Sequence, residues 1–349
     1  MLKVALAGLG AAGRTIHLPA IAKVPELDVC GASDPAVREA PRGIPVFASA
    51  QEMIGAVKPD VLAIASPPAT HAALCRLGLE AGCHVVCEKP FVDTLEEAAA
   101  LAALSRERGR WLVVNNQYRF MNIHREARSR VGKEGFGDLL FVLALQAFVT
   151  SDATETGWRG KETRRTCKEF GTHVLDLCRF FFDEEPSRIR ARMPRAGRSG
   201  SPDLLNVIEL EFSRDRMACI VLDRLSRGPH RYLDIRLDGS DGCIETSIGG
   251  VAELALGVKG GTRRPFATLE LAGGGRAYHH RDGRRATIAR DPVDLFATAT
   301  SRVYAELCKA IQTGGTPPCH AGDNGRTLAL MLAAYESAER GGVPIELAP

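Results

Sequence analysis

Several features that mark specialised protein classes are scarce in this sequence of 349 residues. No apolar run is long enough to cross a bilayer, since the longest candidate, residues 139–149, already contains Gln146. The first residues lack the charged, apolar and small-residue order of a signal peptide. The net charge is only +3, and the basic residues are scattered. We therefore expect a cytoplasmic protein that binds neither membranes nor nucleic acid.

Paired cysteines are also absent. The sequence has ten cysteines but no CxxC pair, and Cys83 with Cys87 has no second pair to complete a zinc site. In a long chain without a secretion signal, separate cysteines are typical of reduced thiols. The sequence therefore predicts no structural metal site and no disulfide framework.

What the sequence does contain is an alternation of short apolar strands and helices up to about residue 120. The first predicted strand comprises Val4, Leu6 and the alanines beside them. The further predicted strands are 27–32, 44–48, 61–65, 84–87 and 111–114, and the predicted helices are 51–57, 70–81 and 95–108. This order is typical of a parallel sheet with crossover helices. It predicts an α/β fold whose N-terminal domain is a doubly wound (Rossmann) nucleotide-binding sheet.

The pattern changes after residue 115. In 206–212 and 232–238, apolar residues alternate with charged ones, as they do in sheets that are covered on one face only. Further strands are predicted at 139–149, 217–225, 243–247 and 252–258, and helices at 123–131, 303–312 and 324–340. Surface loops are predicted at 195–202 and 257–264. This part is expected to be an α+β domain with a large open, mainly antiparallel sheet.

The length also favours more than one domain, because single cores rarely grow beyond about 300 residues. We expect a dinucleotide-binding domain at 1–120 and a substrate-binding and oligomerisation domain at 121–315. The remaining residues, 316–349, are expected to form a C-terminal helix that returns to pack near the first domain.

The first candidate site is the glycine loop 8–13, which lies between the first strand and a helix. In a GxGxxG loop, Gly8 permits the tight turn, Gly10 lets the backbone approach a pyrophosphate, and Gly13 lets helix and strand pack closely. Ala11 and Ala12 complete the loop, so that free N–H groups at the helix start can bind the phosphates.

Asp34 ends the second strand at about 20 residues beyond the loop, the spacing of the carboxylate that binds the adenosine ribose. Such a carboxylate repels a 2′-phosphate, so the sequence favours NAD over NADP. Arg38 lies close enough to keep NADP as an alternative, and Asp34 followed by Pro35 could also be a simple turn.

Two further clusters follow the fourth and fifth strands, at the sheet edge where ligands bind in such folds. Ser66, Pro67 and His71 belong to the first cluster, in which Thr70 could instead cap the next helix. Glu88 and Lys89 belong to the second. A lysine at this edge can polarise a substrate oxygen while hydride moves at the same carbon, although most lysines are only solvated.

The segment 166–176 predicts a helix on which Glu169, His173 and Asp176 share one face. A histidine between carboxylates can exchange protons near neutral pH, and the carboxylates would orient it and raise its proton affinity. Alternatively, Thr166 and Glu169 form a capping box that only closes the helix end. A metal site on this face is less favoured, because no fourth ligand is evident.

Polar residues near the domain junction suit a polyhydroxylated or anionic substrate, although interdomain hydrogen bonds would explain them equally well. These residues are 115–120, which include Tyr118 and Arg119, together with Trp158 and Arg159.

Taken together, these stretches resemble the glucose–fructose oxidoreductase and inositol dehydrogenase (GFO/IDH/MocA) family. The motifs AGLGAAGRTIHLPA, IASPPATHAAL, AGCHVVCEKP, NNQYRF and GTHVLDLCRFF occur in the order and at the spacing typical of the family. The resemblance implies hydride transfer between NAD(P) and a hydroxyl or carbonyl carbon of a sugar, cyclitol or related polyol. It also implies a homodimer or homotetramer formed through the C-terminal sheet.

The resemblance further implies roles for individual residues. It makes Lys89, His173, Glu169 and Asp176 the catalytic candidates. The cofactor would contact the loop residues 8–13 with Asp34, Ser66, Pro67, His71, Glu88 and Lys89. The substrate would contact Lys89, Tyr118, Arg119, Trp158, Arg159, Arg165 and His173.

The chain departs from the family pattern at two places. Thr163, Arg164 and Arg165 replace a run of glycines, and Glu169 replaces an aspartate, so an anionic substrate attracted by Arg164 or Arg165 is one expectation. Two other functions fit the same residues. One is redox-neutral glycoside cleavage with NAD kept bound, and the other is a regulator that binds nucleotide or sugar without catalysis.

Overall fold

The computed structural model describes residues 1–37, 39–149, 159–195, 202–249, 253–259, 264–270 and 274–347. The chain divides into two compact units. The first unit comprises Met1–Phe120, Lys168–Asp176 and Phe296–Ala333, and the second comprises Met121–Cys167, Leu177–Leu295 and Ala334–Pro349. The segments 168–176 and 296–315, which the sequence analysis placed in the second domain, thus belong to the first unit.

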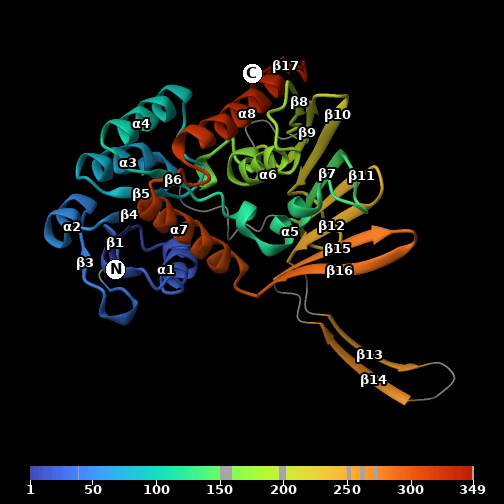
Figure 1. Cartoon of the computed structure of the whole chain (residues 1–349), viewed down its shortest axis with the longest axis horizontal. Helices are drawn as coiled ribbons and strands as arrows, with labels where there is room; N and C mark the ends of the chain where they lie inside the picture. The colour runs from blue at the N-terminus through green and yellow to red at the C-terminus, as the bar shows by residue number, and fades with distance from the viewer. Residues whose placement is uncertain are drawn as a thin grey trace. The chain divides into compact units, whose positions relative to one another are not determined.

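The first unit is built on a six-stranded parallel sheet of order β3-β2-β1-β4-β5-β6 (Figure 1). Its strands are β1 (Leu2–Ala7), β2 (Leu27–Ser33), β3 (Val46–Phe47), β4 (Val61–Ile64), β5 (His84–Cys87) and β6 (Leu112–Val114). Every residue of β4 is buried, as expected for a parallel strand covered on both faces. The predicted doubly wound sheet is confirmed.

The helices of this unit also follow the predicted order. They are α1 (Leu18–Ile21), α2 (Ala50–Val57), α3 (His71–Glu80), α4 (Leu95–Glu107) and α7 (Leu295–Thr313), and α3 and α4 lie side by side (Figure 1). The helix after the glycine loop begins with a π-helical turn, η1 (Gly13–His17), before α1. Short 3-10 turns lie at η2 (Pro41–Gly43), η3 (Pro68–Thr70) and η4 (Gln117–Phe120).

The second unit contains a nine-stranded sheet of order β16-β15-β12-β11-β7-β10-β9-β8-β17. Neighbouring strands are antiparallel except β7 and β10, which are parallel. The strands are β7 (Leu139–Ala147), β8 (Arg188–Arg192), β9 (Leu205–Phe212), β10 (Arg216–Asp223), β11 (Arg231–Gly239), β12 (Cys243–Ile248), β15 (Gly275–Arg281), β16 (Arg284–Asp291) and β17 (Ile345–Glu346). The predicted open, mainly antiparallel sheet is confirmed.

Alternation explains which face of this sheet is covered. In β9, Asn206, Ile208, Leu210 and Phe212 are buried, whereas the residues between them are partly or fully exposed. Helix α5 (Asn122–Arg130) packs on β12, β15 and β16. The helices α6 (Thr172–Phe182) and α8 (Ala321–Glu339) each contribute residues to both units.

The structure differs from the predictions for this region in two ways. The strands β8, β15 and β16 were not predicted, because arginines and histidines occupy many of their positions and leave few apolar residues. The loop predicted at 257–264 is wrong at both ends, where β13 (Glu253–Lys259) and β14 (Arg264–Glu270) form a separate two-stranded sheet. Most of the loop predicted at 195–202 lies outside the described residues. Among the described residues, no helix is both long enough and apolar enough to span a membrane.

Candidate functional site

The glycine loop has the shape that a pyrophosphate requires. A Cβ at Gly8, where φ is +104°, would lie 2.6 Å from the carbonyl carbon of Ala65, and a Cβ at Gly13 would lie 2.1 Å from the Gly8 oxygen. A Cβ at Gly10 would meet nothing within 4 Å. Two glycines are thus needed for packing, while Gly10 borders open space at a helix start, where phosphates bind. Gly8, Gly10, Ala11, Ala12 and Gly13 therefore fit a dinucleotide.

Asp34 is joined directly to this loop. One carboxylate oxygen accepts the N–H of Leu9 at 2.9 Å, and the other accepts those of Ala36 and Val37 at 2.9 and 3.2 Å. The carboxylate therefore fixes the end of β2 against the glycine loop, at the position predicted for ribose binding. Arg38, which kept NADP as an alternative, lies outside the described residues.

The loops after β4 and β5 are joined by His71. Its buried ring lies between two carbonyl oxygens, that of Pro90 at 2.8 Å from Nδ1 and that of Ser66 at 3.0 Å from Nε2. Thr70 does not cap the following helix, because its hydroxyl donates to the carbonyl of Pro67 at 2.8 Å. His71 thus sets the spacing between the two loops that carry the cofactor candidates Ser66, Pro67 and Lys89.

Lys89 and His173 both lie in the first unit, with Tyr118. The Lys89 ammonium donates to the carbonyl oxygen of Glu169 at 3.0 Å and lies 5.9 Å from the Phe170 ring. The His173 imidazole stacks face to face on Tyr118, with ring centroids 3.9 Å apart and planes 4° from parallel. The short helical segment 169–173 therefore contacts both Lys89 and Tyr118.

Burial lowers the pKa of His173 well below its usual value, and the positive charge of Lys89 lowers it further. The imidazole is therefore neutral at physiological pH. The expectation that the carboxylates of Glu169 and Asp176 raise its proton affinity stays a prediction. The Glu88 carboxylate does raise the pKa, but burial and the charge of Lys89 outweigh it. Its Nδ1 atom is buried without a hydrogen-bond partner among the described residues, so stacking on Tyr118 orients the ring.

Asp176 binds an arginine and a hydroxyl. Arg119 donates to both of its carboxylate oxygens, at 2.5 and 2.7 Å, and the Thr327 hydroxyl donates at 3.1 Å. Arg119 also pairs with Asp323 at 3.1 Å. Although burial alone would lower the pKa of Arg119, the Asp176 charge raises it. The predicted substrate ligand Arg119 thus belongs to an ion-pair network that fixes η4 against α6 and α8.

The predicted capping box at Thr166 and Glu169 is absent. The Thr166 hydroxyl is buried without a partner among the described residues, and the helix begins with a π-helical turn, Cys167–Gly171. Asp203 caps it instead, because its carboxylate accepts the backbone N–H groups of Arg165, Thr166 and Cys167, the last two at 3.1 Å. The Tyr335 hydroxyl adds a fourth bond at 3.0 Å. A side chain distant in sequence therefore starts the helix that carries His173.

The remaining substrate candidates lie in the second unit or outside the described residues. Arg164 pairs with Glu339, and its guanidinium lies 5.1 Å from the Tyr335 ring, so it already has a carboxylate partner. Arg165 is buried and donates to the Arg159 carbonyl at 3.3 Å. Trp158 is not among the described residues.

A buried polar cluster lies next to Lys89, and the sequence predicted only some of its members. Glu88 was predicted as a cofactor ligand, but its side chain is turned inward and only 9% exposed. Its hydrogen-bonded neighbours are His17 and Asn115, and these in turn bond Tyr304 and Thr300. The polar residues His17 and Asn115 lie in apolar stretches of the sequence, and this was the signal that could have predicted the cluster. Their partners on α7, Tyr304 and Thr300, are distant in sequence and gave no such signal.

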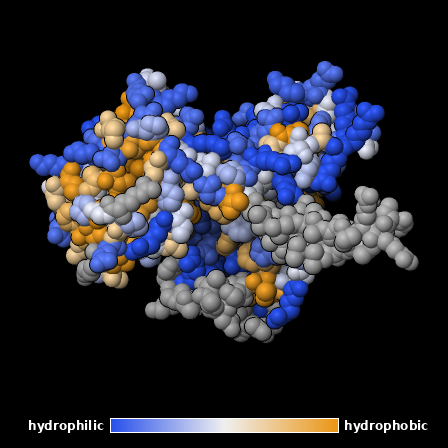
Figure 2. All heavy atoms as spheres, turned by 90° about the horizontal axis from the view of Figure 1, so that it is seen from below, coloured by the Kyte–Doolittle hydropathy of each residue, from blue (hydrophilic) through white to orange (hydrophobic). Residues whose placement is uncertain are grey.

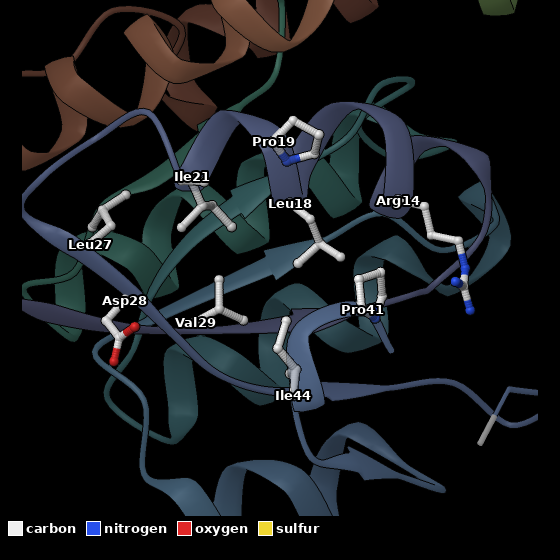
Figure 3. A pocket seen from close by; sticks show the side chains of 10 residues that line it. Arg14, Leu18, Pro19, Ile21, Leu27, Asp28, Val29, Pro41 and Ile44 are labelled. Atoms are coloured by element: carbon white, nitrogen blue, oxygen red, sulfur yellow. The ribbon is translucent and has the colours of Figure 1, made fainter. Parts of the chain in front are cut away.

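A hollow of about 350 Å³ lies elsewhere in the first unit, between α1, β2 and the η2 turn (Figure 3). Leu18 and Ile21 of α1 face Val29 and Ile44 across it. Among the described residues between β2 and β3, the one helical element is the three-residue η2. The surface of the first unit seen from below carries a broad hydrophobic area (Figure 2). No predicted site residue lines the hollow.

Comparison with known proteins gives two family matches. Residues 2–116 match the model of an oxidoreductase family with an NAD-binding Rossmann fold, GFO_IDH_MocA. Residues 124–245 match the GFO/IDH/MocA C-terminal domain. Because both parts of one family occur in their order, the matches agree with the two sheets described above.

Similar individual proteins include sugar dehydrogenases. A D-apiose dehydrogenase of Paraburkholderia graminis is 25% identical over 97% of this chain and 88% of its own length. A D-glucoside 3-dehydrogenase of Escherichia coli is 30% identical over 51% of this chain and 53% of its own. In structure, an oxidoreductase from Agrobacterium radiobacter, solved with NAD+, L-tartaric acid and magnesium, superposes with a TM-score of 0.81 at 18% identity, covering 99% of this chain and 98% of that one. The last likeness concerns the fold alone.

Proposed function

This chain belongs to the GFO/IDH/MocA oxidoreductase family, and we propose that it transfers hydride between NAD and a hydroxyl-bearing carbon of a sugar, cyclitol or related polyol. The observation that carries the proposal is the cluster of a lysine ammonium, a neutral histidine and a supporting tyrosine around one helical segment. The named relatives, dehydrogenases of D-apiose and of D-glucosides, support the substrate class.

When bound, the nicotinamide supplies a carbon that accepts hydride from the substrate carbon or returns it. Neutral His173 takes the proton of the substrate hydroxyl as the carbonyl forms. Because Nδ1 is enclosed, Nε2 is the nitrogen that receives this proton. The Lys89 ammonium donates a hydrogen bond to the same oxygen and stabilises its developing negative charge.

Other residues position these two. Tyr118 holds the imidazole plane, and Arg119 with Asp176 holds the helix that carries it. Glu169 offers its backbone carbonyl to Lys89. Direct substrate contacts by Tyr118, Trp158, Arg159 and Arg165 remain part of the proposal.

The carboxylate of Asp34 favours NAD over NADP, because a 2′-phosphate at its position would be repelled. The loop residues 8–13 would hold the pyrophosphate, and the loops joined by His71 would border the nicotinamide. We further propose that 1–120 binds the nucleotide, that 121–315 binds substrate, and that the protein acts in the cytoplasm.

The proposal is tested by screening sugars, cyclitols and sugar acids with NAD and NADP while following NADH absorbance. With a substrate in hand, Lys89→Ala and His173→Ala should each lower kcat by about 100-fold or more, as expected for loss of a proton-transfer group. Both variants should bind NADH with unchanged Kd. Sugar release without NADH accumulation would instead indicate redox-neutral glycoside cleavage, and normal turnover in both variants would contradict the assignment.

We also propose that the chain forms a homodimer or homotetramer through the open face of the nine-stranded sheet. Two adjacent parallel strands present apolar side chains there, in which Phe141, Leu143 and Leu145 of β7 pair with Met217, Cys219 and Val221 of β10. These side chains are partly or fully exposed, and such a strip is typical of an interface core.

Light scattering of the purified protein should give two or four subunits. Leu143→Arg places a charge in the middle of the strip, so it should yield monomers. The matched change Arg130→Leu, on the partly exposed end of α5, should leave the subunit number unchanged. A wild-type monomer would contradict the interface.

A further inference from the structure

Glu88 carries a buried carboxylate that the proposed reaction does not use. Its Oε1 atom accepts the Nε2–H of His17 at 3.0 Å and the Asn115 amide at 2.7 Å. Its Oε2 atom accepts the backbone N–H of Lys89 at 3.2 Å. Three donors from the protein therefore surround the carboxylate, and one of them is the main chain of the lysine itself.

These bonds extend to a long helix of the same unit. His17 Nδ1 lies 2.7 Å from the Tyr304 hydroxyl, and the Asn115 amide also reaches the Thr300 hydroxyl at 3.2 Å. Since a carboxylate can only accept, His17 carries its proton on Nε2. Burial raises the pKa of Tyr304 well above its usual value, so the hydroxyl keeps its proton. The cluster thus joins η1, the loops after β5 and β6, and α7.

The carboxylate is charged despite its burial. Burial alone would raise the pKa of Glu88, but the hydrogen bond and charge of His17, followed by the charge of Lys89, lower it to about 2. The same negative charge also acts on His173, where it opposes the effect of Lys89 on the imidazole pKa. The imidazole also stacks on the ring of Tyr118.

We propose that Glu88 is a positioning residue for Lys89 and His173 and not a ligand of the nucleotide. The inference rests on the proposed function, because it assigns Glu88 a part in the same site. Because the Glu88 carboxylate accepts the backbone N–H of Lys89, the cluster fixes the backbone position from which the Lys89 side chain extends to the Glu169 carbonyl. By its charge, Glu88 balances the ammonium beside a histidine that must accept a proton.

Glu88→Gln tests the proposal, because it keeps the side-chain size and removes the charge. We expect kcat to fall by about tenfold to a hundredfold, as for a misplaced catalytic group, while the substrate KM and the NADH Kd stay within about twofold. Glu107→Gln, the same change on an exposed residue of α4, is the control. A loss of NADH affinity of about tenfold with kcat retained at saturation would make Glu88 a cofactor ligand and overturn the proposal.

Tyr304→Phe is the second variant, because it removes one hydroxyl of the cluster and leaves Glu88 in place. It should show the same pattern with a smaller fall in kcat. If Glu88→Gln does not fold, this variant alone decides, and unchanged kcat in it would refute the positioning role.

A measurement on the nucleotide-free protein separates this inference from the proposed function. Reductive methylation of Lys89, followed by mass spectrometry, reports how firmly the amine is held. It should be several-fold faster in Glu88→Gln and Tyr304→Phe than in wild type or Glu107→Gln. Equal rates would overturn the inference even in an active enzyme. If the wild type oxidises or reduces no polyol, the proposed function fails, and the labelling still decides whether Glu88 positions Lys89.

Discussion

The buried charge of Glu88 should make the free energy of unfolding depend on pH, and Glu88→Gln should remove this part of the pH dependence. The pKa of its carboxyl is about 2 in the folded protein and 4.5 in the reference state, and each pKa unit corresponds to about 1.4 kcal/mol. The difference of about 2.5 pKa units amounts to about 3 to 4 kcal/mol of folding free energy from this one group. Because the folded pKa is depressed, this contribution is fully present above the reference value and is lost as the pH falls through about 2.

Urea unfolding of wild type and Glu88→Gln at several pH values between 2 and 7 measures this contribution. The difference in unfolding free energy between the two proteins should grow by about 3 to 4 kcal/mol from the acid end to above pH 5, and then stay constant. Other carboxylates titrate in both proteins and cancel in the difference. Glu107→Gln controls for the loss of one surface charge. A difference between wild type and Glu88→Gln that does not change with pH would show that the carboxylate is not ionised in its buried cluster.

The other predictions concern the glycine loop, the helix cap and the histidine. Gly10→Ala should fold normally and weaken NADH binding, whereas Gly13→Ala should destabilise the fold because its Cβ meets the Gly8 oxygen. Melting curves and NADH titrations distinguish the two variants. Equal stabilities of the two variants would contradict the loop geometry. Asp203→Ala should lower the free energy of unfolding by about 2 to 4 kcal/mol, because three backbone N–H groups and the Tyr335 hydroxyl lose their acceptor. A decrease of less than about 0.5 kcal/mol would contradict the proposed helix cap. Because the pKa of His173 is lowered, kcat for alcohol oxidation should stay constant around pH 6.5, where a histidine usually titrates. Lys89→Met should raise the pKa of His173, so the fall of kcat at acidic pH should move to higher pH. A steep decline near pH 6.5 in wild type would contradict the neutral imidazole.

The sequence predicted the first sheet closely because its strands are short apolar runs between glycines, prolines and charged turns. The strand predicted at 84–87 has those bounds in the structure, and the helix predicted at 95–108 differs from α4 by one residue. In the second sheet, β9 and β11 were predicted from alternation, whereas β8, β15 and β16 were missed. RIRAR and RRATIARD are rich in arginine, and the few apolar residues between the arginines give too weak a pattern.

At the candidate site, the sequence suggested Lys89 and His173 as catalytic candidates but did not predict the contacts that these two residues make. The π-helical turn Cys167–Gly171 changes the faces of the helix, so spacing alone could not place Glu169, His173 and Asp176 on one side. Asp176 faces Arg119, and Asp203 replaces the expected capping box. Both depend on contacts between residues far apart in the chain, which local patterns do not encode.

The central claim is that Lys89 and His173 act on the same substrate oxygen, and a double-mutant cycle tests it most directly. We would measure kcat for Lys89→Ala, His173→Ala and the double variant with NAD and the polyol substrate found by screening. Groups that act as a unit lose their effect together, so the double variant should be about as slow as the slower single variant. Losses that multiply in the double variant, or single variants with normal turnover, would contradict the account.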